Sequence, residues 1–268
     1  MFSPYYARAR RRGLGDPLNH VGLNVALYGP RSKRWALTER GRGAIARTAD
    51  WLAIGPSELV RDDNGLTVRI HEVTVPFPTR IHGTVRVLPA AEQHRSWPLD
   101  PAGRHRWTPF APLARVEVAL DSPALRWSGT AYCDSNAGDR PLEDDFIRWD
   151  WSRAHRSGAT DLLYDVTHPS GQACLALHCG PAGIEEREPP PVAMLKRTAW
   201  QLHRTTRATP GDGAQVLRTL EDTPFYARSL LGLHGQDAPT MHETLSLTRF
   251  RSPVVQLMLP FRMPRAWR

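Results

Sequence analysis

The feature that most constrains the fold is a long succession of short strand-like segments, separated by turns that contain glycine and proline. Apolar and polar residues alternate most clearly over residues 66–73, which predicts a strand buried on one face only. Turn sequences such as Asp63-Asn64-Gly65 lie between these segments. The 24 prolines and 20 glycines leave little room for long helices. We therefore expect an all-β protein.

The number of strand-like segments also bears on domain organisation. They are too many for one eight-stranded barrel, and two stacked antiparallel β-barrels accommodate them better. We expect two domains, residues 1–122 and 123–268, with a boundary near Ser122-Pro123. Short helices are expected at residues 41–49 and 142–145.

The chain carries a net charge of +8, and nearly all of its positive charge is arginine because Lys33 and Lys196 are the only lysines. Such a charge attracts anionic surfaces, although a GC-rich genome accounts for the arginine equally well. The basic residues are scattered and form no nucleic-acid module, so a membrane surface is favoured over nucleic acid. The arginines expected to meet headgroups are Arg8, Arg10, Arg11, Arg12, Arg262, Arg265 and Arg268.

Several patterns are absent from the sequence. It has no apolar run of eighteen residues and no secretory signal, which makes a cytoplasmic location the default expectation. It has no dinucleotide or phosphate-binding glycine loop, no zinc-protease helix motif and no nucleophile elbow. Cys133, Cys174 and Cys179 form neither a zinc pattern nor a disulfide framework. We expect neither a metal nor a nucleotide cofactor.

The stretch 126–139 contains the first candidate site. Tyr132 and Asp134 share one face of a strand because side chains alternate with period two. An apolar environment on that face would raise the pKa of the carboxyl group and leave a neutral acid that can donate a proton. The alternative is an aspartate that caps the turn after the strand. Trp127 of the same stretch is a candidate for substrate contact.

Two further clusters carry aromatic residues. His105 and Trp107 share a face of an extended segment, where an imidazole can hold a water and an indole can face a cation. Trp149 and Trp151 also share a face and can wall a cavity for a flat polyene. The structural alternatives are a surface histidine and tryptophans that fill the core.

A last cluster covers residues 218–228, in which two acids precede Thr-Pro and an aromatic pair. It has the composition of a tight turn between strands. Glu221 and Tyr226 remain candidates for supporting the site.

Eight segments together resemble the purple-bacterial carotenoid 1,2-hydratases, also called hydroxyneurosporene synthases. They are residues 2–6, 16–29, 34–41, 103–107, 125–139, 148–152, 218–229 and 259–265. The resemblance implies two lipocalin-like barrels in tandem and hydration of the terminal 1,2 double bond of an acyclic carotenoid such as neurosporene or lycopene, without a cofactor. The product would be a tertiary alcohol on the way to spheroidene or spirilloxanthin.

Carried to this sequence, the resemblance makes Asp134 the acid, with Tyr132, Trp107 and His105 around it. The expected protein is a cytoplasmic enzyme associated peripherally with the inner membrane, with carotenoid and water as substrates. Two alternatives stay open: a carotenoid carrier without catalysis, and a cofactor-free cyclase or isomerase that acts on a polyene. The sequence does not determine the oligomeric state.

Overall fold

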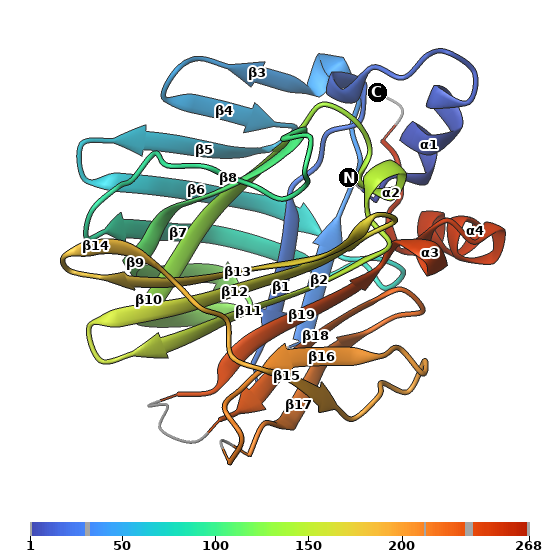
Figure 1. Ribbon diagram of the computed structural model, residues 1–268. Coiled ribbons are helices and arrows are strands. Elements are labelled where there is room, and N and C mark those ends of the chain that lie inside the picture. The colour runs from blue at the N-terminus through green and yellow to red at the C-terminus, as the bar shows by residue number, and fades with distance from the viewer. Residues whose placement is uncertain (1, 30–32, 212, 234–237, 267–268) are drawn as a thin grey trace. The chain divides into compact units, whose positions relative to one another are not determined.

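Antiparallel strands make up most of the chain, which confirms the expected all-β class (Figure 1). The computed structural model describes residues 2–29, 33–211, 213–233 and 238–266. The chain forms two compact units. Unit 1 comprises residues 1–91, 114–131 and 256–268, and unit 2 comprises residues 92–113 and 132–255.

The main sheet of unit 1 has the strand order β10-β9-β7-β6-β5-β4-β3. Its strands are β3 (Ile45–Arg47), β4 (Trp51–Ile54), β5 (Ser57–Asp62), β6 (Gly65–Val73), β7 (Arg80–Pro89), β9 (His105–Ser122) and β10 (Ala124–Gly138). A separate ribbon pairs β1 (Asn24–Tyr28) with β2 (Lys33–Leu37).

Burial in unit 1 follows the alternation seen in the sequence. Ile70 of β6 and Ile81 of β7 are buried, as is Glu72, two residues along β6 from Ile70. The buried Glu72 carboxylate accepts hydrogen bonds from the Arg40 guanidinium at 2.8 Å and from the Ser57 hydroxyl at 2.9 Å. Ion pairing and hydrogen bonding together make the burial of this charge tolerable.

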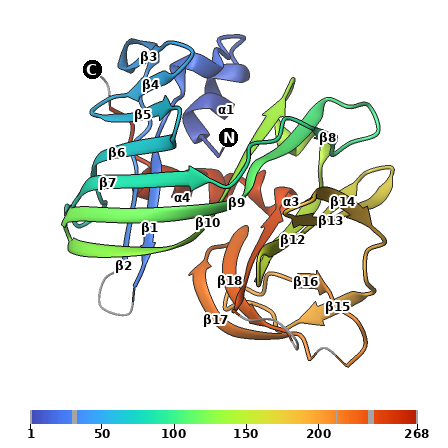
Figure 2. The same ribbon diagram turned by 90° about the vertical axis from the view of Figure 1, so that its left-hand side faces the viewer.

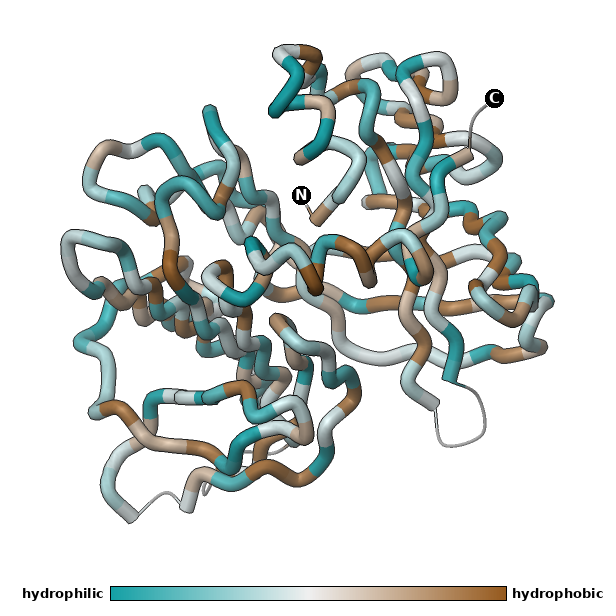
Figure 3. The backbone as a smooth tube through the Cα atoms, turned by 90° about the vertical axis from the view of Figure 1, so that its right-hand side faces the viewer, coloured by the Kyte–Doolittle hydropathy of each residue, from teal (hydrophilic) through white to brown (hydrophobic). Residues whose placement is uncertain are grey.

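The main sheet of unit 2 has the order β14-β13-β12-β11-β19-β18-β17. Its strands are β11 (Arg148–Arg156), β12 (Ala159–His168), β13 (Gly171–Gly180), β14 (Gly183–Arg187), β17 (Gln215–Asp222), β18 (Tyr226–Gly232) and β19 (Thr240–Ser246). A second pair joins β15 (Val192–Leu195) to β16 (Arg204–Arg207). The short β8 (Trp97–Pro98) pairs with β9. Hydrophobic and hydrophilic residues follow one another at short intervals along the chain (Figure 3).

The helices are short. They are α1 (Pro4–Arg10), η1 (Pro17–Asn19), η2 (Arg42–Ala44), α2 (Leu142–Asp145), α3 (Leu247–Phe250) and α4 (Pro253–Arg262). The helix expected at 142–145 is confirmed, whereas the one expected at 41–49 is wrong. There the chain makes one 3₁₀ turn and then enters β3, because Ile45 and Ala46 pair with β4. Sequence reasoning missed α1, α3 and α4.

The division into units differs from a split of the chain into two halves. The expected boundary at Ser122-Pro123 lies within unit 1, in the turn between β9 and β10. These two strands are 18 and 15 residues long (Figure 2). Residues 114–131 around their turn belong to unit 1 and their remaining residues to unit 2. Each unit is therefore built from discontinuous segments.

Candidate functional site

The main sheet of unit 2 has two faces of different chemistry, because neighbouring residues on each strand point to opposite sides. The aromatic face carries Trp149 and Trp151 of β11 and, paired with Trp151, Tyr164 of β12. The polar face carries Asp150, which pairs with Asp165 of β12. The expectation that Trp149 and Trp151 share a face agrees with this register.

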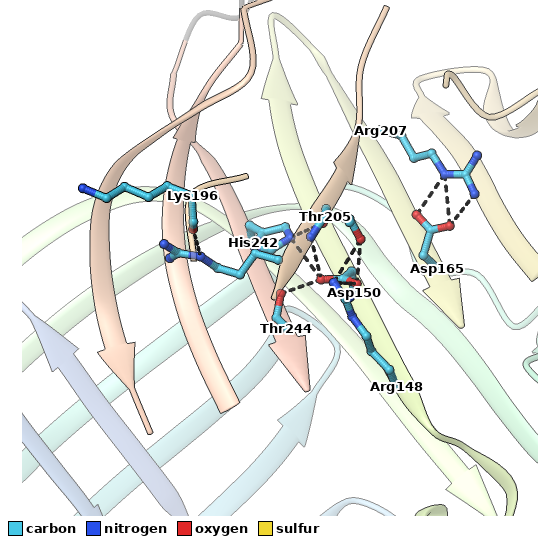
Figure 4. A network of polar contacts seen from close by, with 9 residues as sticks. Arg148, Asp150, Asp165, Lys196, Thr205, Arg207, His242 and Thr244 are labelled. Atoms are coloured by element: carbon cyan, nitrogen blue, oxygen red, sulfur yellow. Dashed lines mark hydrogen bonds and ion pairs between the residues drawn. The ribbon is translucent and has the colours of Figure 1, made fainter. Parts of the chain in front are cut away.

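A buried hydrogen-bond network centred on Asp150 joins the polar face to β16 (Figure 4). The Asp150 carboxylate accepts from the hydroxyls of Thr205 at 2.9 Å and Thr244 at 2.5 Å, and Arg148 approaches it to 2.6 Å. His242 is fully buried, and its Nε2 lies 2.8 Å from the Thr205 carbonyl oxygen. These groups bind one another, so the network serves the architecture.

The aromatic face meets the side chains of β9 and β10 that the sequence singled out. The Tyr132 ring lies 5.4 Å from the Trp151 ring, and the Trp107 ring lies 5.1 Å from that of Tyr164, edge to face. Trp149 also packs edge to face on Tyr164, at 5.8 Å. All five residues belong to unit 2. The fold thus gathers three separately predicted motifs around one patch of sheet.

Asp134 is held at the centre of this patch. Its Oδ2 accepts a hydrogen bond from the Trp107 indole at 2.7 Å and another from the Tyr132 hydroxyl at 3.0 Å. The backbone N–H of Asp134 also hydrogen-bonds to this carboxyl group, and the residue stays partly accessible. The two ring donors therefore hold one oxygen in place.

The electrostatics of Asp134 match those of an acid. Burial raises the pKa of the carboxyl group above its ordinary value of 3.8, and the hydrogen bonds from Trp107 and Tyr132 lower it by less. Burial and the Asp134 charge also raise the pKa of Tyr132, so its phenol stays protonated and donates. The raised pKa agrees with the expected effect of an apolar environment on this carboxyl group, and Tyr132 is one of its two side-chain donors.

Trp107 and His105 differ in detail from what the sequence led us to expect. The Trp107 side chain is fully buried, so its ring is not open to a ligand and its contribution is the N–H that it donates to Asp134. His105 is 2% exposed and its Nε2 lies 2.8 Å from Oδ2 of Asp145, at the end of α2. Asp145 also binds Arg104 and Arg140. His105 is thus tied to α2, two residues from Trp107.

The remaining predicted residues lie apart from Asp134 to different degrees. Trp127 is about half exposed and belongs to unit 1. Tyr226 and Glu221 belong to unit 2, where Arg228 joins Glu221 to Glu243. Sequence reasoning missed Asp145 and Glu243. An acidic helical turn signalled the first, and only the sheet register identifies the second.

Side chains that could bind a metal do not cluster in the described part of the chain. It contains no group of three or more His, Cys, Asp or Glu side chains able to hold a metal ion. The three cysteines are free, and burial raises the pKa of Cys133 to about 11 and that of Cys179 to about 12. Their thiols are therefore protonated at neutral pH and poor metal ligands.

Comparison with known proteins identifies relatives along the whole chain. The family profile described as Carotenoid hydratase CrtC matches residues 1–268. The chain is 56% identical over 271 residues to the acyclic carotenoid 1,2-hydratase of Thiocapsa roseopersicina, covering 99% of this chain and 67% of that protein. Identity to the hydratase of the same name from Rubrivivax gelatinosus is 48% over 272 residues, with the same two coverages. The Cereibacter sphaeroides hydratase is 37% identical over 270 residues, covering 99% and 95%.

A solved structure gives the fold class independently. A protein of Nitrosomonas europaea described as AttH superposes with a TM-score of 0.56 at 16% identity, covering 80% of this chain and 77% of that one. The chain is thus an all-β protein of lipocalin-like architecture. It belongs to the CrtC family of carotenoid hydratases.

Proposed function

We propose that this protein adds water to the terminal 1,2 double bond of an acyclic carotenoid such as neurosporene or lycopene, giving a 1-hydroxy carotenoid. The observation that carries the proposal is the environment of Asp134. Burial favours its neutral form, and Trp107 and Tyr132 both donate to one of its oxygens. Family membership identifies the substrate class, and the site supplies the chemistry.

The first step is proton transfer from Oδ1 of Asp134 to C2 of the alkene, which leaves a tertiary cation at C1. The carboxylate that forms already accepts hydrogen bonds from Trp107 and Tyr132 through Oδ2. Donors in place before charge develops stabilise it without reorganisation, which lowers the barrier to proton transfer. Both donors therefore assist proton transfer from Asp134, although they bind Oδ2 and not the oxygen that carries the proton.

The cation at C1 then needs stabilisation from the protein. Tyr132 and Trp151 are the candidates, because both are only partly buried and their rings pack together at 5.4 Å. The face of an aromatic ring attracts a cation by about 2 kcal/mol when water is excluded. Trp107 is not available for this role because it is fully buried.

His105 is assigned a positioning role. Its bond to Asp145 anchors the beginning of β9, and its ring packs on Phe146 at 4.8 Å. Because Trp107 follows two residues later on the same side of the strand, this anchor fixes where the indole N–H points.

Incubation with lycopene or neurosporene in membranes or detergent, followed by mass analysis, tests the activity. We expect a product heavier than the substrate by the mass of one water. Recovery of unchanged carotenoid bound to the protein would indicate a carrier, and a product of unchanged mass would indicate an isomerase or a cyclase. Either result would overturn the proposal.

We further propose that the protein works at a membrane surface, with part of the polyene remaining in lipid. None of the helices formed by the described residues is long and apolar enough to cross a membrane. However, α4 exposes four large apolar side chains on one face, at spacings of three and four residues. They are Val254 (65% exposed), Leu257 (73%), Met258 (40%) and Phe261 (79%). Such a stripe is suited to the boundary between headgroups and acyl chains.

The arginines of unit 1 support this surface role only in part. Arg8, Arg11, Arg12 and Arg262 are exposed. Arg265 is not available for headgroups, because its side chain is 9% exposed and pairs with Glu39. Its inclusion in the basic surface was therefore wrong, and Arg268 lies outside the described residues.

Vesicle sedimentation tests the membrane role. We expect the parent protein to sediment with vesicles containing phosphatidylglycerol more than with phosphatidylcholine alone, and less at high salt. The double variant Leu257→Glu/Phe261→Glu should lose most of this binding, because it places two charges in the apolar stripe. Leu217→Glu, which places one charge on an exposed leucine of β17 (52% exposed), is the control and should bind like the parent. Equal sedimentation of all three proteins would contradict the assignment of α4.

A further inference from the structure

A single row of paired residues crosses five strands on the aromatic face. From β18 to β13 it reads Arg228, Glu243, Trp151, Tyr164 and Leu175, each paired with the next. Tyr132 packs on Trp151 and Trp107 packs on Tyr164, so the two donors to Asp134 lie over the middle of this row. Glu243 is the next residue along from Trp151. The register therefore places a second carboxyl group beside the aromatic pair.

The Glu243 carboxylate is held in one orientation. Nε and Nη2 of Arg228 lie 2.9 and 2.8 Å from its Oε1, and the Tyr226 side chain also hydrogen-bonds to it. Nη1 of Arg228 reaches Glu221 at 3.3 Å, so the guanidinium itself is braced. Nevertheless, 24% of the Glu243 side chain remains accessible. It is thus a fixed carboxylate that a small molecule can still reach.

Glu243 and Asp134 also influence each other. Burial raises the pKa of Glu243 above its ordinary value of 4.5, Arg228 and Tyr226 lower it, and the charge of Asp134 raises it. Burial raises the pKa of the Tyr164 phenol, and the charges of Asp134 and Glu243 each raise it further. The two carboxyl groups therefore belong to one electrostatic environment, although 109 residues separate them in sequence.

Two neighbours indicate what this second carboxylate faces. Trp151 pairs with Glu243 on the neighbouring strand, and its buried indole N–H has no acceptor among the described residues. Buried donors of this kind are normally satisfied, and a bound molecule is a common partner. In addition, the Arg153 guanidinium lies 5.9 Å from the Tyr132 ring. The Arg153 charge would repel a carbocation formed at that ring. A carboxylate nearby is needed to offset this repulsion.

We propose that Glu243 is the base of the reaction: it holds the attacking water and accepts its proton as the oxygen bonds to C1. This inference rests on the proposed hydration and assigns the second half of it. The C2–H bond forms with the proton of Asp134, the C1–O bond forms with water, and one O–H bond of water breaks toward Glu243. Proton return from Glu243 to Asp134, directly or through solvent, completes the cycle and leaves alkene plus water converted to alcohol. Arg228 and Tyr226 are positioning residues.

Partitioning of the cation in deuterium oxide tests this role. Without the base, a cation made by Asp134 returns to alkene by losing a proton from C2 or from a C1 methyl group. The measured quantity is a ratio of two amounts: carotenoid that has gained deuterium without being hydrated, divided by alcohol product. We expect Glu243→Gln to raise this ratio at least about tenfold, since a general base typically contributes 10²–10⁴-fold to its step.

The ratio does not depend on how much of a variant is folded, so partial misfolding does not obscure it. Glu243→Asp, which keeps the charge but retracts it by one methylene, should give an intermediate ratio. Glu185→Gln, an exposed glutamate on β14, should match the parent. A parental ratio in both Glu243 variants would overturn the assignment of the base while leaving hydration itself intact. Absence of both exchange and hydration in the parent protein would instead refute the proposed function.

Discussion

Asp134→Asn is expected to abolish hydration while leaving the fold in place. An amide cannot deliver the proton, and positioned general acids contribute about 10²–10⁴-fold, so we expect a loss of at least about 100-fold. The carboxamide oxygen can still accept from Trp107 and Tyr132, which preserves the local contacts. Product formation from lycopene, normalised to folded protein, is the measurement. Asp139→Asn, an exposed aspartate five residues further on, is the control and should act like the parent.

The same variant has a distinct signature in stability. The folded-state pKa of Asp134 lies above its ordinary value of 3.8, so the folded protein binds the proton more tightly than the unfolded chain. This contribution is fully present below about pH 3.8 and is lost as pH rises through the folded-state pKa. Asp134→Asn should therefore be at least as stable as the parent at neutral pH, with an advantage that vanishes in acid. An inactive variant that is also much less stable at pH 7 would indicate a structural role for Asp134.

Asp150→Ala is expected to have the opposite profile, with a large loss of stability. The substitution removes the acceptor for Thr205 and Thr244 and leaves Arg148 beside an apolar methyl group on the polar face. Breaking a buried charged network by removing one partner costs about 3–5 kcal/mol. We expect a decrease of that size in the free energy of unfolding, measured by urea titration with unchanged dependence on denaturant.

Asp161→Ala is the matched comparison for Asp150. Asp161 lies on the same face, pairs with Arg156 and His178, and has a side chain that is 26% exposed. Partly solvated pairs contribute about 0–1 kcal/mol, so this variant should lose less than about 1 kcal/mol. An equal decrease in the free energy of unfolding for the two variants would show that burial does not make the Asp150 network more stabilising than the Asp161 pair.

Alternation along single strands was enough to pair neighbouring site residues. Tyr132 with Asp134 and Trp149 with Trp151 share faces because each pair is two positions apart on one strand, whatever the strand contacts. The acidic turn at 142–145 was likewise predicted from its own residues. These are local properties of the chain, and the structure agrees with them.

Contacts between strands were beyond the reach of the sequence. Alternation fixes which side of a strand a residue occupies but not which residue of another strand lies opposite. Only the folded structure shows that Trp107 donates to Asp134, which is 27 residues away. The same holds for the contact of His105 with Asp145, which is 40 residues away. The full burial of Trp107, which changes its role from a ring surface to an N–H donor, is also a property of packing.

The sequence by itself determined the all-β class and the family, and it singled out Asp134 as the proposed acid, because these depend on alternation, turn residues and motifs that are contiguous along the chain. Only the tertiary structure decided the discontinuous units, the donors that hold one oxygen of Asp134, and the place of Glu243 beside Trp151. The physical reason is that strand register is set by the packing of whole sheets. Residues 92 positions apart become neighbours in that register without any local signal in the chain.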